Sequence, residues 1–149
     1  DNLIEQAKKE GVSFVTFLPR ITKKQVATAL IQADVLFIGW LDRPIYHYGV
    51  SPNKLGEYFY AAKPIIQTLI SKYDPVSMTK AGFSIKPYKP EQLNDCLCKI
   101  ISMPTELRFE MGNKGHTYAI EHLDWNKLGQ QYFELCSKVI SGSNVEASH

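Results

Sequence analysis

The residues with the clearest potential for chemistry are the run Ser51-Pro52-Asn53-Lys54 and the nearby Glu57. Serine is a favoured helix N-cap and proline a favoured first helical residue, so the run predicts the start of a helix. The first-turn N–H groups of a helix have no partners inside it and lie at the positive end of its dipole, which favours an anion. Lys54 adds a full charge and Asn53 adds amide donors, so the segment suits a diphosphate.

Glu57 lies one helical turn further along, on the same side of the helix as Asn53 and Lys54. A carboxylate at that place can accept hydrogen bonds from two adjacent ribose hydroxyls, so the spacing indicates a nucleotide and leaves the base open. The alternative is an ordinary capped helix on which Lys54 and Glu57 form only a solvated ion pair. The opposite face is predicted to pack on a sheet through Leu55, Phe59 and Ala62.

The elements before this helix alternate between helix and strand. Leu3–Lys9 has the pattern of an amphipathic helix end, and the β-branched and aromatic run Val12–Leu18 predicts a strand. Thr22–Gln25 has capping-box spacing and predicts a helix that ends near Ala33. The continuous apolar run Val35–Gly39 is typical of a strand covered on both faces.

The alternation continues after a polar and aromatic loop over Leu41–Val50. The predicted strands are Pro64–Leu69 and Phe83–Ile85, and the predicted helices are Pro52–Ala62, a weaker one after Asp74, Glu91–Ser102, Thr105–His122 and Trp125–Ile140. This order predicts an α/β fold, a Rossmann-like parallel sheet with helices on both faces. Ligands of such sheets bind beyond the carboxyl ends of the strands, where the loop after Ile38 and the turn before Pro52 both fall.

Length and composition are consistent with one domain over residues 1–140 and a flexible tail over residues 141–149. The 17 basic and 15 acidic residues form no long runs, which argues against a nucleic acid as partner.

Three cysteines leave one unpaired in any disulfide scheme, so we expect reduced thiols in a cytoplasmic protein. The four histidines show no ligand spacing, and we expect no metal site. A start at Asp1 without methionine suggests a piece of a longer protein.

The run Gly49–Ile65 resembles the donor-binding signature of GT-B-fold glycosyltransferases, in particular the retaining glycosyl transferase group 1 (family 4) enzymes. Their pattern reads G-x-S-P-N-K-L-x-E-Y-x-A-A-G-K-P-I. The flanks agree in order: Ala33-Asp34-Val35, Met111–His116 and Leu123-Asp124-Trp125 also resemble family segments. The resemblance covers nearly the whole chain. It implies the C-terminal half of a GT-B fold, N-terminally truncated, whose first strand and helix and whose acceptor domain would precede Asp1.

The resemblance implies a role for each residue of the signature. Glu57 would hold the ribose hydroxyls, and the helix start formed by Ser51, Pro52, Asn53 and Lys54 would receive the diphosphate. The loop matching Leu18–Ile21 lies against the base in the family, which implicates Arg20 and Ile21. Pro19 departs from the pattern, because glycine is usual there and proline removes a backbone donor.

A second departure is Gly49, which stands where many relatives carry the first glutamate of a Glu-x7-Glu arrangement near the donor sugar. Sugar recognition would then use other groups, and the candidates are the loop side chains Asp42, Arg43, Tyr46, His47 and Tyr48. The cations that neutralise the departing diphosphate in the family come from the part that would precede Asp1. The catalytic residues are therefore not identified, and we expect this chain alone to be inactive or barely active.

By resemblance the function is transfer of a sugar from a nucleotide sugar, a UDP-sugar, to a glycan or lipid-linked acceptor in cell-envelope or capsule polysaccharide synthesis. The reaction would be retaining and metal-independent, with no cofactor, in a protein peripherally associated with the inner face of the membrane. Two alternatives stay open: a nucleotide-sugar epimerase of the same architecture and a non-catalytic nucleotide-sugar-binding module. A dinucleotide oxidoreductase is disfavoured, since no Gly-x-Gly-x-x-Gly follows a strand.

Overall fold

The computed structural model describes residues 2–51 and 53–141, so Pro52 and the predicted tail beyond Ser141 lie outside the described residues. The strands are β1 (Leu36–Gly39), β2 (Ile65–Thr68) and β3 (Gly82–Ile85). The helices are α1 (Asn2–Lys9), α2 (Lys23–Gln32), the 3-10 helix η1 (Pro44–Tyr48), α3 (Asn53–Tyr60), α4 (Pro75–Thr79), α5 (Pro90–Ser102), α6 (Thr105–His122) and α7 (Trp125–Ile140).

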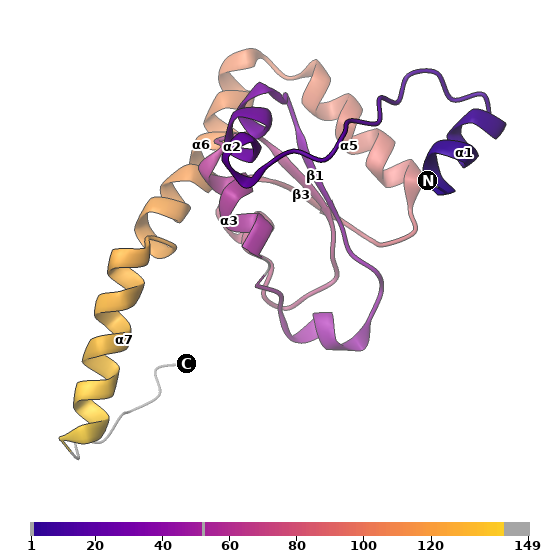
Figure 1. Cartoon of the computed structure of the whole chain (residues 1–149). Coiled ribbons are helices and arrows are strands. Elements are labelled where there is room, and N and C mark those ends of the chain that lie inside the picture. Colours follow the sequence, from indigo (N-terminus) through magenta and orange to yellow (C-terminus); the bar gives the residue numbers. More distant parts are fainter. Residues whose placement is uncertain (1, 52, 142–149) are drawn as a thin grey trace.

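The three strands form one parallel sheet in the order β1-β2-β3 (Figure 1). Leu36 is paired in register with Ile65, and Ile65 with Gly82. Each connection between neighbouring strands contains a helix, α3 for the first and α4 for the second, as parallel strands require. The predicted Rossmann-like α/β architecture is therefore confirmed.

Helices cover both faces of this sheet, as predicted. On one face α3, α4 and α6 enclose a core that contains Leu55 (4% exposed) and Phe59 (1% exposed), both expected to pack on the sheet. On the other face α5 packs on β3 around Ile66 and Ile100. The prediction for Ala62 was wrong: α3 ends at Tyr60, and Ala62 is in a left-handed turn with φ of 54°.

The expectation that β1 is covered on both faces holds for one face only. Leu36 and Ile38 are buried, whereas Phe37 is 47% exposed. The reason is the position of α5, which lies against β3 at the other edge of the sheet and leaves this face of β1 open.

The predicted strand over Val12–Leu18 is wrong. The segment runs in an extended path from α1 to α2 without strand pairing, and Figure 1 shows it crossing the body as a loop. Phe14 is 88% exposed and Leu18 is 78% exposed. A strand needs a neighbouring strand for its hydrogen bonds, and the described residues provide none for this segment.

Helix α7 leads away from the body, as Figure 1 shows, and none of its described side chains is buried. Its bounds match the predicted helix, and Asp124 caps it by accepting from the N–H groups of Asn126 (3.0 Å) and Lys127 (3.1 Å). Among the described residues, no helix is both long enough and apolar enough to cross a membrane.

Candidate functional site

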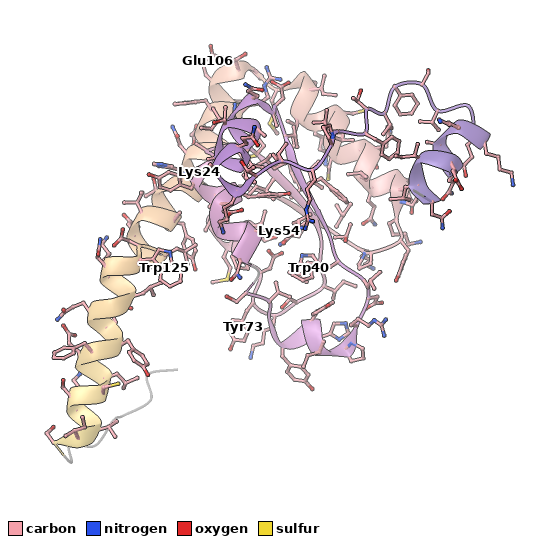
Figure 2. All side chains as sticks on the ribbon, viewed as in Figure 1. Lys24, Trp40, Lys54, Tyr73, Glu106 and Trp125 are labelled. Atoms are coloured by element: carbon pink, nitrogen blue, oxygen red, sulfur yellow. The ribbon has the colours of Figure 1, made fainter. Side chains whose placement is uncertain are left out.

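The predicted anion site lies at the start of α3, which Figure 2 locates through Lys54. Ser51, Asn53 and Lys54 are all exposed. The ion pairs formed by the described residues do not include Lys54, so its ammonium is accessible. Pro52 lies outside the described residues. The groups at this helix start are thus accessible to a ligand, and the anion site stays a prediction.

Glu57 pairs with a residue of another helix. Its Oε1 lies 3.2 Å from Nζ of Lys23, in the first turn of α2, and not against Lys54 of its own helix. The Glu57 side chain is 38% exposed, and that of Lys23 is 89% exposed. The contact places the start of α2 beside the middle of α3.

This contact also locates the predicted base loop. Arg20 and Ile21 come directly before α2, and both are exposed. The start of α2 is fixed by Gln25, whose side-chain oxygen accepts from the N–H (2.9 Å) and the hydroxyl (2.8 Å) of Thr22. The capping-box prediction at Thr22 is thus confirmed. The structure brings this loop and Glu57 to the same region of the surface.

The carboxyl ends of β1 and β2 are joined through Trp40 and Thr68. The N–H of Trp40 donates to the Thr68 hydroxyl (2.6 Å), which in turn donates to the carbonyl of Trp40 (2.9 Å). The Trp40 ring packs edge-to-face on Tyr46 of η1, with the centroids 5.1 Å apart. Figure 2 shows Trp40 and Tyr73 toward the η1 end of the body, whereas Glu106 lies at the opposite end. Loop side chains therefore gather at the edge where ligands of parallel sheets bind.

The five loop side chains proposed for sugar recognition differ in their surroundings. Asp42 and His47 face each other at 3.4 Å, and Tyr46 packs on Trp40. Arg43 and Tyr48 are exposed, the latter by 80%. The carbonyl of His47 accepts from the N–H of Lys72 at 3.1 Å, which ties this loop to the one after β2.

Gly49 has a backbone conformation that disfavours an acid at this position. Its φ of 132° is in the region that favours glycine, and a Cβ there would lie 3.5 Å from Cβ of Tyr73. A glutamate at this position would be strained even though space is available.

A buried polar cluster lies next to the carboxyl-end edge of the sheet. Gln67 of β2 is fully buried, and its side-chain nitrogen donates to Asp74 and, at 3.0 Å, to the hydroxyl of Ser84. Asp74 caps α4 by accepting from the N–H groups of Val76 (3.1 Å) and Ser77 (3.2 Å). The cluster fixes the loop between β2 and α4, against which the loop of Gly49 lies.

Four residues of this region were missed by sequence reasoning. Trp40 and Thr68 lie at the carboxyl ends of predicted strands, where ligands of parallel sheets bind, so the sequence alone could have identified them as candidates. Gln67 is the one glutamine within the apolar run Pro64–Leu69, and a polar side chain in a buried strand predicts a hydrogen-bonded role. Lys23 had no local signal, because its contact with Glu57 depends on how two helices pack.

The surroundings of Tyr58, which is next to Glu57, change its pKa. Burial, and after it the negative charge of Glu57, raises the pKa of Tyr58 above its ordinary value of 10.0. The Tyr58 hydroxyl donates to the carbonyl of Phe37 at 3.3 Å, which links α3 to β1.

No cluster of three or more His, Cys, Asp or Glu side chains suited to a metal ion occurs among residues 2–51 and 53–141.

An open groove of about 480 Å³ lies elsewhere, between α4 and α6. Glu110 and Lys114 line it and form an ion pair at 2.8 Å; the hydrogen bond from Lys114 lowers the pKa of Glu110. The groove contains none of the predicted donor-site residues. It is therefore separate from the site at α3.

Comparison with solved structures finds a similar fold in a sucrose-phosphate synthase from Thermosynechococcus elongatus, with a TM-score of 0.77 and 16% sequence identity. The similarity covers 95% of this chain and 34% of that chain, so this chain spans about a third of its length. No protein-family model matches the chain, and no curated protein matches it in sequence. The likeness supports the predicted fold, the Rossmann-like half of a GT-B architecture. Membership of family 4 stays a prediction.

Proposed function

We propose that this domain binds a nucleotide sugar and presents it for transfer to a glycan or lipid-linked acceptor. The observation that carries the proposal is the 3.2 Å contact between Lys23 and Glu57. This contact brings the loop of Arg20 and Ile21 beside the carboxylate of α3, so a base and a ribose have neighbouring partners. The fold likeness to a sucrose-phosphate synthase supports sugar chemistry as the setting.

Each part of the ligand has a proposed partner. Glu57 accepts hydrogen bonds from the two ribose hydroxyls, since an ionised carboxylate accepts on both oxygens. The first turn of α3 and Lys54 hold the diphosphate through N–H groups and charge. Arg20 and Ile21 contact the base, which the resemblance of the signature suggests is uracil.

The wider reaction is part of the same proposal. A retaining, metal-independent transfer in envelope or capsule polysaccharide synthesis, at the cytoplasmic face of a membrane, follows from the resemblance of the Gly49–Ile65 signature. The acceptor binds outside this chain.

A non-catalytic nucleotide-sugar-binding module is the second candidate, and Gly49 favours it. Its φ of 132° disfavours the acid that relatives use near the donor sugar. The two candidates share the ligand and differ in whether UDP is released in the presence of an acceptor.

Titration calorimetry with UDP, UDP-sugars, ADP and GDP tests the shared proposal. Saturable binding of UDP and UDP-sugars, tighter than of the purine nucleotides, is the expected result. Failure of every nucleoside diphosphate to bind at millimolar concentration contradicts it. Product analysis with a glycan acceptor then separates transfer, which releases UDP, from epimerisation, which yields a sugar nucleotide with one centre inverted.

A further inference from the structure

We infer that Lys23 is a positioning residue of the donor site, which holds the Glu57 carboxylate where the ribose hydroxyls bind; this rests on the proposed nucleotide-sugar function. Nζ of Lys23 lies 3.2 Å from Oε1 of Glu57. The two residues belong to different helices, so the ion pair sets the direction of the carboxylate relative to the base loop before α2.

The place of Lys23 in its own helix is unfavourable. Lys23 and Lys24 occupy the first turn of α2, which contains no acidic residue. Cations at this end of a helix oppose the helix dipole, whereas acidic residues there are stabilising. Helix stability therefore accounts for neither lysine, and residues that break a local rule are expected at functional sites. The ion pair with Glu57 distinguishes Lys23 from Lys24.

The ion pair leaves Glu57 able to bind a ligand. A carboxylate has about four lone-pair directions on its two oxygens, and the ammonium of Lys23 takes one of them on Oε1. Among the described residues none donates a hydrogen bond to Oε2, and the side chain is 38% exposed. A ribose diol can approach this oxygen while Lys23 stays in place, so Lys23 orients the carboxylate without competing for it.

The test compares Lys23→Met with the matched control Lys24→Met, which removes a neighbouring positive charge from the same helical turn. For UDP, calorimetry is expected to show binding weakened about threefold to tenfold by Lys23→Met and changed less than about twofold by Lys24→Met. Lys23→Arg keeps the charge and is expected to restore affinity to within about twofold of the parent protein. Circular dichroism and thermal unfolding establish that each variant is folded.

The sugar hydroxyls provide a readout that a structural role would not move. With 2′,3′-dideoxyuridine diphosphate, which lacks both hydroxyls, Lys23→Met is expected to have no effect. Equal losses for UDP and the dideoxy nucleotide would show that Lys23 contacts the phosphates or base directly and would overturn the inference. If the parent protein binds UDP and Lys23→Met binds it equally well, the inference about Lys23 is wrong while the proposed function stands. If the parent protein binds no UDP, the proposed function fails with it.

Discussion

The backbone of Trp40 and the hydroxyl of Thr68 exchange two hydrogen bonds across the carboxyl ends of β1 and β2, at 2.6 Å and 2.9 Å. The Trp40 N–H is the donor of one bond, and its carbonyl is the acceptor of the other. One side chain therefore fixes the first residue of the loop that follows β1, the loop on which Tyr46 and Gly49 lie. Rigid attachment of loops at this edge is what a ligand site on a parallel sheet requires.

Thr68→Val is expected to destabilise the protein by about 1–2 kcal/mol, because it keeps the side-chain shape and leaves two backbone groups of Trp40 without their partner. Thr68→Ser keeps the hydroxyl and should lose less. Urea unfolding measures both values. A Thr68→Val protein as stable as the parent would show that the two hydrogen bonds do not hold the loop.

Gly112→Ala is expected to destabilise the protein although alanine is the better helix former by about 1 kcal/mol. A Cβ at Gly112 would lie 2.0 Å from the carbonyl oxygen of Ala62, so α6 would have to move away from the end of α3. Overpacking of this kind typically costs about 1–3 kcal/mol.

Gly129 of α7 is the matched control for this substitution. A Cβ there meets nothing within 4 Å, so Gly129→Ala should be neutral or stabilising by up to about 1 kcal/mol. The midpoints of urea unfolding should therefore move in opposite directions. If both alanine variants were stabilised, the close approach of α6 to α3 would be wrong.

Gly49→Glu would introduce the acid that many enzymes with the resembled signature carry, and is nevertheless expected to harm the protein. The φ of 132° at Gly49 imposes a strain of about 1–3 kcal/mol on any other residue. Tyr48→Glu puts a carboxylate one position earlier on an 80% exposed side chain and should be tolerated. Thermal unfolding of the two variants separates backbone strain from the effect of charge. A Gly49→Glu protein with the parent's stability and tighter binding of a UDP-sugar would refute the explanation.

Tyr58 should make stability depend on pH above 10. Burial, then Glu57, raises the pKa of Tyr58 in the folded protein above 10.0, its ordinary value, so the folded state keeps a proton that the unfolded state releases. This contribution to stability is fully present below pH 10 and is lost as pH rises through the folded pKa. Tyr58→Phe cannot ionise, so its free energy of unfolding should fall less steeply over that range. Parallel decline of parent and variant would contradict the effect.

Much of the fold could be predicted from local sequence. The apolar runs that contain β1 and β2 located these strands to within two residues, and the bounds of α6 and α7 were predicted correctly. The strand at Val12–Leu18 was wrong because local composition describes the tendency of a segment and cannot supply a neighbouring strand. The open face of β1 likewise depends on where α5 packs.

The site was predictable to the extent that it lies on one helix. The spacing of Lys54 and Glu57 along α3 follows from helix geometry alone. The contact of Glu57 with Lys23 could not be predicted, since it joins two helices whose relative placement is set by the core around Leu55 and Phe59. The strain at Gly49 is similarly a property of the folded loop.

Binding of the ribose of a nucleotide sugar by Glu57 is best tested through the affinity of Glu57→Ala for UDP. Glu106→Ala, which removes an exposed carboxylate at the end of the body away from η1, is the control (Figure 2). We predict that Glu57→Ala binds UDP more than about tenfold more weakly, the scale of one or two charge-assisted hydrogen bonds, while Glu106→Ala binds as the parent does. Unchanged affinity in a folded Glu57→Ala protein would contradict the claim.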